Sequence, residues 1–237
     1  MLDLQGQDST LAQLAHRKQS LPEHALIGEL IETIDKLDGR RVEAETTVSD
    51  LTRDQKKADG EVELVKSRRA RDEERMNSGQ ITNPKDLESM QREIVALDRR
   101  IGTLEEEELE VMEALEVAQS GLDVFRAELD EEKARLAEAE ATRDKAVAEL
   151  DGKAVDAATE RDVLAGKVPD DLLSLYDKVR AHNGGLGAAA LRQRRCEGCR
   201  LELNGADLRE ISAKADDEVL RCPECDRILV RTLESGL

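Results

Sequence analysis

The sequence predicts a mainly α-helical protein, with a long antiparallel coiled-coil hairpin followed by a small α+β domain at the C-terminus. Three observations support this prediction. Apolar residues recur every 3.5 residues over much of the first 165 positions. Aromatic residues make up only 1% of the 237-residue chain and charged residues 38%, which is typical of long helices rather than of a large globular core. The four cysteines fall in two close pairs near the C-terminus.

Residues 1–165 are expected to form the hairpin, with a short helix over residues 3–18 and long helices over residues 21–77 and 84–165. Ser20 and Glu23 have the spacing of a capping box, which predicts that Ser20 starts the first long helix. Asn83 before Pro84 predicts the start of the second. The run from Asn77 to Gly79 is a helix stop signal, and so short a link joins antiparallel helices.

Each long helix carries two lines of heptad positions. In the first helix, 10 of 14 such positions between Leu30 and Met76 are apolar. In the second, the lines run from Leu87 to Leu164 and from Met90 to Glu160. The second helix would be about 120 Å long and the first about 85 Å, at 1.5 Å per residue. The N-terminal helix is therefore expected to pack against the C-terminal part of the second long helix.

The remaining residues are expected to form a linker and a small domain. Residues 166–187 read as a short helix, capped by Asp170, and a glycine-rich linker. Residues 188–237 read as the small α+β domain, with strands over residues 201–203 and 228–230. Asn204 is expected to cap a helix that ends near Ala215.

The cysteine pairs predict a metal site. Cys196 and Cys199 form one pair, Cys222 and Cys225 the other, and 22 residues separate the pairs. A two-residue spacer lets both thiolates of a pair reach one ion, and two pairs complete a tetrahedral set, so the small domain reads as a zinc ribbon that binds one structural Zn²⁺. Because four protein ligands leave no position for water, hydrolytic zinc chemistry is not expected.

Cysteine pairs can serve two other purposes, a disulfide framework or a redox switch. A disulfide framework needs an oxidising compartment, and the N-terminus has no basic and apolar segment typical of a secretory signal. With no apolar run of about 18 residues either, a cytoplasmic protein with no membrane partner is expected. A thiol redox switch, in which oxidation ejects the metal, stays as an alternative. Neither a phosphate-binding glycine loop nor a catalytic triad pattern is present, so no enzymatic activity is expected.

The charge distribution points to interaction surfaces. The net charge is −18, and residues 103–165 hold 7 basic and 20 acidic side chains, which phosphate backbones would repel. We expect a protein partner, and the sequence neither requires nor excludes a homodimer. Nucleic acid is the alternative partner, through basic residues near the hairpin tip and at the entry to the ribbon. The candidate contacts are Arg68, Arg69, Arg71, Arg75, Lys85 and Arg92 at the tip, and Arg192, Arg194, Arg195 and Arg200 at the ribbon.

The whole pattern resembles a bacterial family of coiled-coil proteins that end in a four-cysteine zinc ribbon. The resemblance rests on the cysteine pairs together with the segments Leu2–Gln5, Leu21–Pro22, Asn83–Leu87, Glu93–Ile94, Leu104–Glu113 and Pro169–Tyr176. Members of this family usually carry glycine where this chain has Asp226. The resemblance implies non-enzymatic work, because members resemble chaperones or adaptors linked to sigma-factor binding, flagellin messenger RNA and type III secretion.

Overall fold

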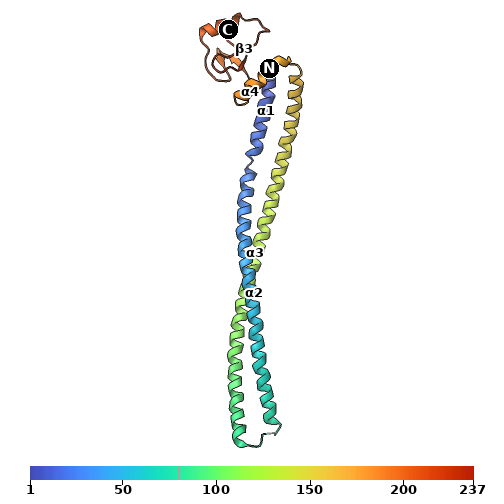
Figure 1. Cartoon of the computed structure of the whole chain (residues 1–237), viewed down its shortest axis with the longest axis vertical. Coiled ribbons are helices and arrows are strands. Elements are labelled where there is room, and N and C mark those ends of the chain that lie inside the picture. The colour runs from blue at the N-terminus through green and yellow to red at the C-terminus, as the bar shows by residue number, and fades with distance from the viewer. Residues whose placement is uncertain (80) are drawn as a thin grey trace. The chain divides into compact units, whose positions relative to one another are not determined.

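The computed structural model describes residues 1–79 and 81–237 and confirms a mainly helical chain with a small strand-containing C-terminal region. Within the described residues, no helix is both long enough and apolar enough to cross a membrane. The elements in chain order are α1 (Leu2–Gln19), α2 (Pro22–Asn77), α3 (Pro84–Ala165), α4 (Asp170–His182), β1 (Ala188–Arg192), β2 (Arg195–Cys196), α5 (Gly205–Ala213), β3 (Leu220–Arg221) and β4 (Ile228–Val230) (Figure 1).

The chain divides into two compact units. One contains residues 26–139, and the other contains residues 1–25 together with residues 140–237. This division differs from a boundary at residue 165, because α1 and the C-terminal end of α3 belong with the ribbon. Leu4 of α1 and Leu164 of α3 pack in one apolar cluster with Ala188 and Ile228 of the sheet. We call this second unit, residues 1–25 and 140–237, the head unit.

The unit of residues 26–139 is a helical hairpin in which α2 and α3 lie alongside each other (Figure 1). The predicted seam positions are buried or half-buried, and Leu30, Leu37 and Leu129 are among the most buried. The polar seam residue Arg41 is half-buried, and its guanidinium pairs with the carboxylates of Asp38 and Glu45 on its own helix. The heptad pattern therefore predicts which face of each helix is covered.

Of the two caps predicted for the long helices, the structure confirms one and corrects the other. The Asn83 side chain accepts a hydrogen bond from the backbone N–H of Lys85 at 3.1 Å and so caps α3. Ser20 does not start α2. Its hydroxyl donates to the carbonyl of Arg17, so Ser20 ends α1, and α2 begins at Pro22.

The heptad prediction also fails near the C-terminal end of α3. Lys153 and Glu160, which it places in the seam, are exposed, and Ala154 and Arg161 are half-buried instead. From here on, one of the two lines of seam positions is displaced by one residue toward the C-terminus. An extra spacing of four residues between successive seam positions has this effect on a heptad pattern. In this stretch α3 packs against α1, as predicted, and Lys18 pairs with Asp151 at 2.7 Å.

The ribbon contains a four-stranded sheet in the order β2-β1-β4-β3. β1 and β4 are parallel, with Ala188 opposite Ile228, and the other neighbours are antiparallel. Leu191 on β1 and Leu229 on β4 lie in a buried core with Leu208 of α5. Cys196 and Cys222 belong to this core, and Cys199 and Cys225 pack against it.

Several ribbon elements differ from the sequence prediction. β1 was missed, because its alanines favour helix and only pairing with β4 makes it a strand. Residues 201–203 are not a strand, since only Glu202 forms an isolated bridge. Asn204 caps α5 as predicted, but α5 ends at Ala213. Asp170 is not a cap, because it already lies inside α4 and Pro169 holds the cap position.

Candidate metal centre and its supporting contacts

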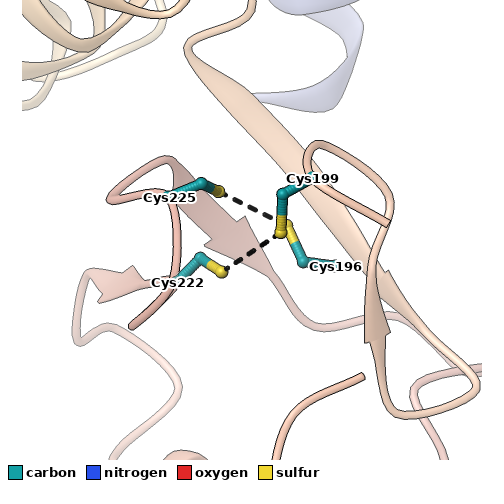
Figure 2. A group of neighbouring side chains, drawn as sticks. All are labelled: Cys196, Cys199, Cys222 and Cys225. Carbon is teal, nitrogen blue, oxygen red and sulfur yellow. Dashed lines mark hydrogen bonds between the residues drawn. The ribbon is translucent and has the colours of Figure 1, made fainter. Parts of the chain in front are cut away.

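The four cysteines converge on one point in the ribbon. Their ligand atoms all lie within 4.8 Å of one another, and none of the four is in a disulfide. The Cys196 and Cys225 sulfurs are 3.9 Å apart, as are those of Cys199 and Cys222 (Figure 2). A tetrahedral zinc ion with Zn–S distances of about 2.3 Å requires S···S distances of about 3.8 Å. The spacing fits one structural Zn²⁺ with all four positions filled by the chain.

Each cysteine pair is closed by a tight turn that needs one residue in the left-handed backbone conformation. The Arg200 N–H donates to the Cys196 carbonyl at 2.7 Å, and the Asp226 N–H to the Cys222 carbonyl at 2.9 Å. Arg200 and Asp226 therefore have φ angles of +64° and +60°. Glycine adopts this conformation without cost and aspartate tolerates it better than most residues. The left-handed turn is the physical reason that the position of Asp226 suits glycine.

Burial and hydrogen bonding act differently on the thiols. Burial raises the pKa of Cys196 and of Cys222. Burial opposes ionisation of Cys225 as well, but hydrogen bonds from the backbone and side chain of Arg227 lower the pKa of Cys225 to about 7. The Arg227 guanidinium also donates to the carbonyls of Leu186 and Asn183 at 3.0 and 3.1 Å. Arg227 thus ties the second cysteine pair to the linker after α4.

A second structural centre, which no sequence pattern predicted, is a buried polar cluster between α1, α3, α4 and β1. We call it the joint and define it by Gln5, Asp8, Arg161, Tyr176 and Arg180. Asp8 is 1% exposed and Tyr176 is fully buried. The Tyr176 hydroxyl donates to Asp8 at 2.6 Å, and burial, followed by this hydrogen bond, raises the pKa of Tyr176. The joint couples residues more than 150 positions apart.

Hydrogen bonds and ion pairs satisfy most of the other polar atoms of the joint, and the buried Nε of Arg180 is an exception. Asp8 accepts from Arg161 at 3.0 Å and pairs with Arg180 at 3.2 Å. The Gln5 carbonyl oxygen accepts from the backbone N–H groups of Gly187 and Ala188 at 2.6 and 3.2 Å, where β1 begins. Because buried polar groups are stable only when paired, this network fixes how the ribbon joins α1.

Several of the candidate basic residues at the tip are already paired. Arg68 forms ion pairs with Glu93 and Asp72. Arg69 pairs with Asp98 at 2.7 Å and with Glu73 at 2.8 Å. Among the described residues, the side chains of four tip residues form no ion pair: Arg71, Arg75, Lys85 and Arg92.

The candidate basic residues at the ribbon divide in the same way. Arg192 pairs with Glu234 at 2.6 Å and with Glu197 at 3.1 Å, and Arg195 pairs with Glu202 at 3.7 Å. Within the described part of the chain, Arg194 and Arg200 have no ion pair. Arg194 belongs to the turn between β1 and β2, where Gln193 and Arg194 both have positive φ.

Comparisons with known proteins agree with this architecture. Residues 4–184 match the CT398-like coiled coil hairpin domain, and residues 195–229 match the C4-type zinc ribbon domain. The uncharacterized protein Rv2229c of Mycobacterium tuberculosis is 35% identical over 231 residues, covering 98% of this chain and 94% of that protein.

Two solved structures share the fold. A Mycobacterium smegmatis protein is 36% identical with a TM-score of 0.84, and the match covers 97% of this chain and 94% of that one. CT398 from Chlamydia trachomatis is 15% identical with a TM-score of 0.66, covering 98% and 95%, so it supports the fold alone. This chain therefore belongs to the family of CT398-like coiled-coil hairpin proteins and ends in a C4-type zinc ribbon.

Proposed function

We propose that this zinc-binding coiled-coil protein is a non-enzymatic adaptor, in which the head unit presents a folded surface to a protein partner. The supporting observation is the closed set of four thiols. When zinc is bound, its four positions are filled by Cys196, Cys199, Cys222 and Cys225, so no position is left for water or substrate. The metal then stabilises a small domain rather than carrying a reaction.

The joint supports the same proposal. A binding surface needs a rigid base, since a partner would otherwise have to order it at a cost in affinity. The network around Asp8 and Tyr176 connects the ribbon to both α1 and α3 within the head unit. The expected role of the ribbon is to present its outer surface in one fixed orientation on these helices.

Ion pairing favours a protein partner over nucleic acid. Arg68, Arg69, Arg192 and Arg195 would have to give up carboxylate partners before contacting phosphates. The chain has two aromatic residues, and neither is exposed for stacking on bases, since Tyr176 is buried and Phe125 is half-buried in the hairpin seam. Nucleic-acid binding is the second candidate function. It would rest on the basic tip residues that form no ion pair among the described residues: Arg71, Arg75, Lys85 and Arg92.

The test is crosslinking in cells, followed by purification of the tagged chain with and without nuclease and identification of partners by mass spectrometry. The wild-type chain is compared with a variant carrying Arg71→Glu and Arg75→Glu. The proposal predicts partners that resist nuclease and are kept by this variant. Partners lost with nuclease and with the variant would instead establish the nucleic-acid role.

A thiol redox switch makes a separate prediction. If oxidation ejects the metal, peroxide treatment should lower the number of titratable thiols and release zinc together. For a structural site, we expect zinc content and thiol count to stay unchanged at peroxide levels that oxidise free thiols. Release of zinc at those levels would replace the adaptor proposal with a sensor.

A further inference from the structure

A groove on the head unit lies next to the sheet, and none of its lining residues is a cysteine. It has a volume of about 410 Å³ and draws its walls from four places in the head unit: the start of α1, α4, the segment before β3, and strands β3 and β4. The lining residues are Met1, Leu172, Asp216, Asp217, Glu218, Val219, Leu220, Ile228, Leu229, Val230 and Arg231.

The lining combines an apolar floor with an acidic rim. Leu220, Ile228 and Leu229 are buried, and Leu172 and Val230 are half-buried, so the floor is apolar and well packed. The rim side chains Asp216, Asp217 and Glu218 are all exposed. An apolar floor with a charged edge is the arrangement of a site that takes one apolar side chain and one opposite charge.

The charges of the rim are only partly neutralised within the chain. Arg231 pairs with Asp216 at 3.1 Å and donates to the carbonyls of Lys214 and Ala215, which anchors this segment. Lys214 pairs with Glu218 at 3.4 Å on the exposed surface. Among the described residues, Asp217 has no ion pair. The side chains that line the groove thus carry three carboxylates against one guanidinium.

We propose that this groove binds a short segment of a partner protein in which lysine or arginine stands beside a large aliphatic side chain. The aliphatic side chain would lie over Leu172, Ile228 and Val230, and the basic group would pair with Asp217 and Glu218. This inference rests on the adaptor function proposed above and names the chemistry of the partner. Charge complementarity is the reason for choosing a basic segment over an acidic or neutral one.

The experiment is a selection from a phage-displayed library of random heptapeptides on the zinc-loaded full-length chain. The same selection is run on a groove variant, Asp217→Lys with Glu218→Lys, and on a control with equal charge change elsewhere on the ribbon, Glu202→Lys with Glu224→Lys. Asp216 is left in place, because its pair with Arg231 anchors the segment. Zinc content and circular dichroism are measured on all three proteins.

The proposal predicts a wild-type consensus with lysine or arginine next to leucine, isoleucine, valine or methionine. A peptide of that consensus should bind the groove variant at least tenfold more weakly and the control unchanged, with binding that weakens as salt rises. A milder variant, Asp217→Asn with Glu218→Gln, should give an intermediate loss without charge reversal.

Three outcomes would overturn the proposal: no consensus, an acidic or neutral consensus, or equal binding to the groove variant. A consensus that matches a segment of this chain, with concentration-dependent self-association, would make a second copy the occupant instead. Failure of the groove proposal can be told apart from failure of the adaptor function. If cellular crosslinking still yields a nuclease-resistant partner that the groove variant keeps, the adaptor function stands and only the groove proposal is wrong.

Discussion

Replacing Asp8 by alanine tests whether the joint holds the head unit together. Asp8 is 1% exposed and accepts hydrogen bonds from the Tyr176 hydroxyl and from Arg161, and it pairs with Arg180. The change leaves a buried hydroxyl without its acceptor, which costs about 1–3 kcal/mol. It also leaves the guanidinium of Arg180 without an ion pair among the described residues, while Arg161 keeps its pairs with Asp177 and Asp162.

The full magnitude depends on how well water can replace the carboxylate. Breaking a buried ion pair by removing one partner costs about 3–5 kcal/mol. The side chains of Arg161 and Arg180 are 22% and 32% exposed, so water recovers part of this loss. We expect Asp8→Ala to destabilise the head unit by about 3–4 kcal/mol in total. Asp3→Ala, an exposed aspartate on the same helix, should cost under about 1 kcal/mol.

The assay uses a convenient property of the sequence. The chain has one tyrosine and no tryptophan, so its tyrosine fluorescence reports only on Tyr176 in the joint. Urea unfolding followed by this signal should shift to lower urea for Asp8→Ala, while helical circular dichroism, dominated by the long helices, changes much less. If Asp8→Ala and Asp3→Ala unfold at the same urea concentration, the joint does not stabilise the head unit.

Three further perturbations test the zinc site, the pKa of Tyr176 and the packing around Gly187. Cys222→Ser should abolish zinc binding and make the ribbon protease-sensitive while the hairpin stays helical, and retention of both zinc and protease resistance would contradict this. Because the folded head unit raises the pKa of Tyr176 above 10.0, its contribution to stability is complete below pH 10 and falls by about 1.4 kcal/mol per pH unit above it. Urea unfolding of the head unit, followed by protease sensitivity because Tyr176→Phe removes the only tyrosine, should show this fall in the wild type and not in Tyr176→Phe. Gly187→Ala would place a methyl group 2.7 Å from the Tyr176 ring and should cost about 1–3 kcal/mol in the same assay. Gly152→Ala, with open space around it, should not destabilise.

The sequence predicted those features that depend on local patterns. Heptad spacing gave the covered faces of the hairpin, and the two-residue spacers gave the zinc ligands, because both depend on residues close in the chain. The caps at Asn83 and Asn204 were predicted for the same reason. The fold class follows from these features alone.

The features that were missed depend on distant contacts. Gln5, Asp8 and Tyr176 are ordinary residues in amphipathic helices, and only the packing of α1 on α4 makes them a buried network. β1 is a strand only because Ala188 pairs with Ile228, 40 positions later. The basic residues form a pattern in the sequence, but their neutralisation, such as that of Arg69 by Asp98 across the hairpin, depends on tertiary structure.

Amide hydrogen exchange before and after zinc removal by a chelator shows directly whether the metal folds the surface that the head unit presents. Chelation should remove protection from residues 188–230, which include the sheet and most of the groove floor, while residues 26–139 stay protected. Unchanged protection in residues 188–230 after complete loss of zinc would show that the ribbon folds without its metal.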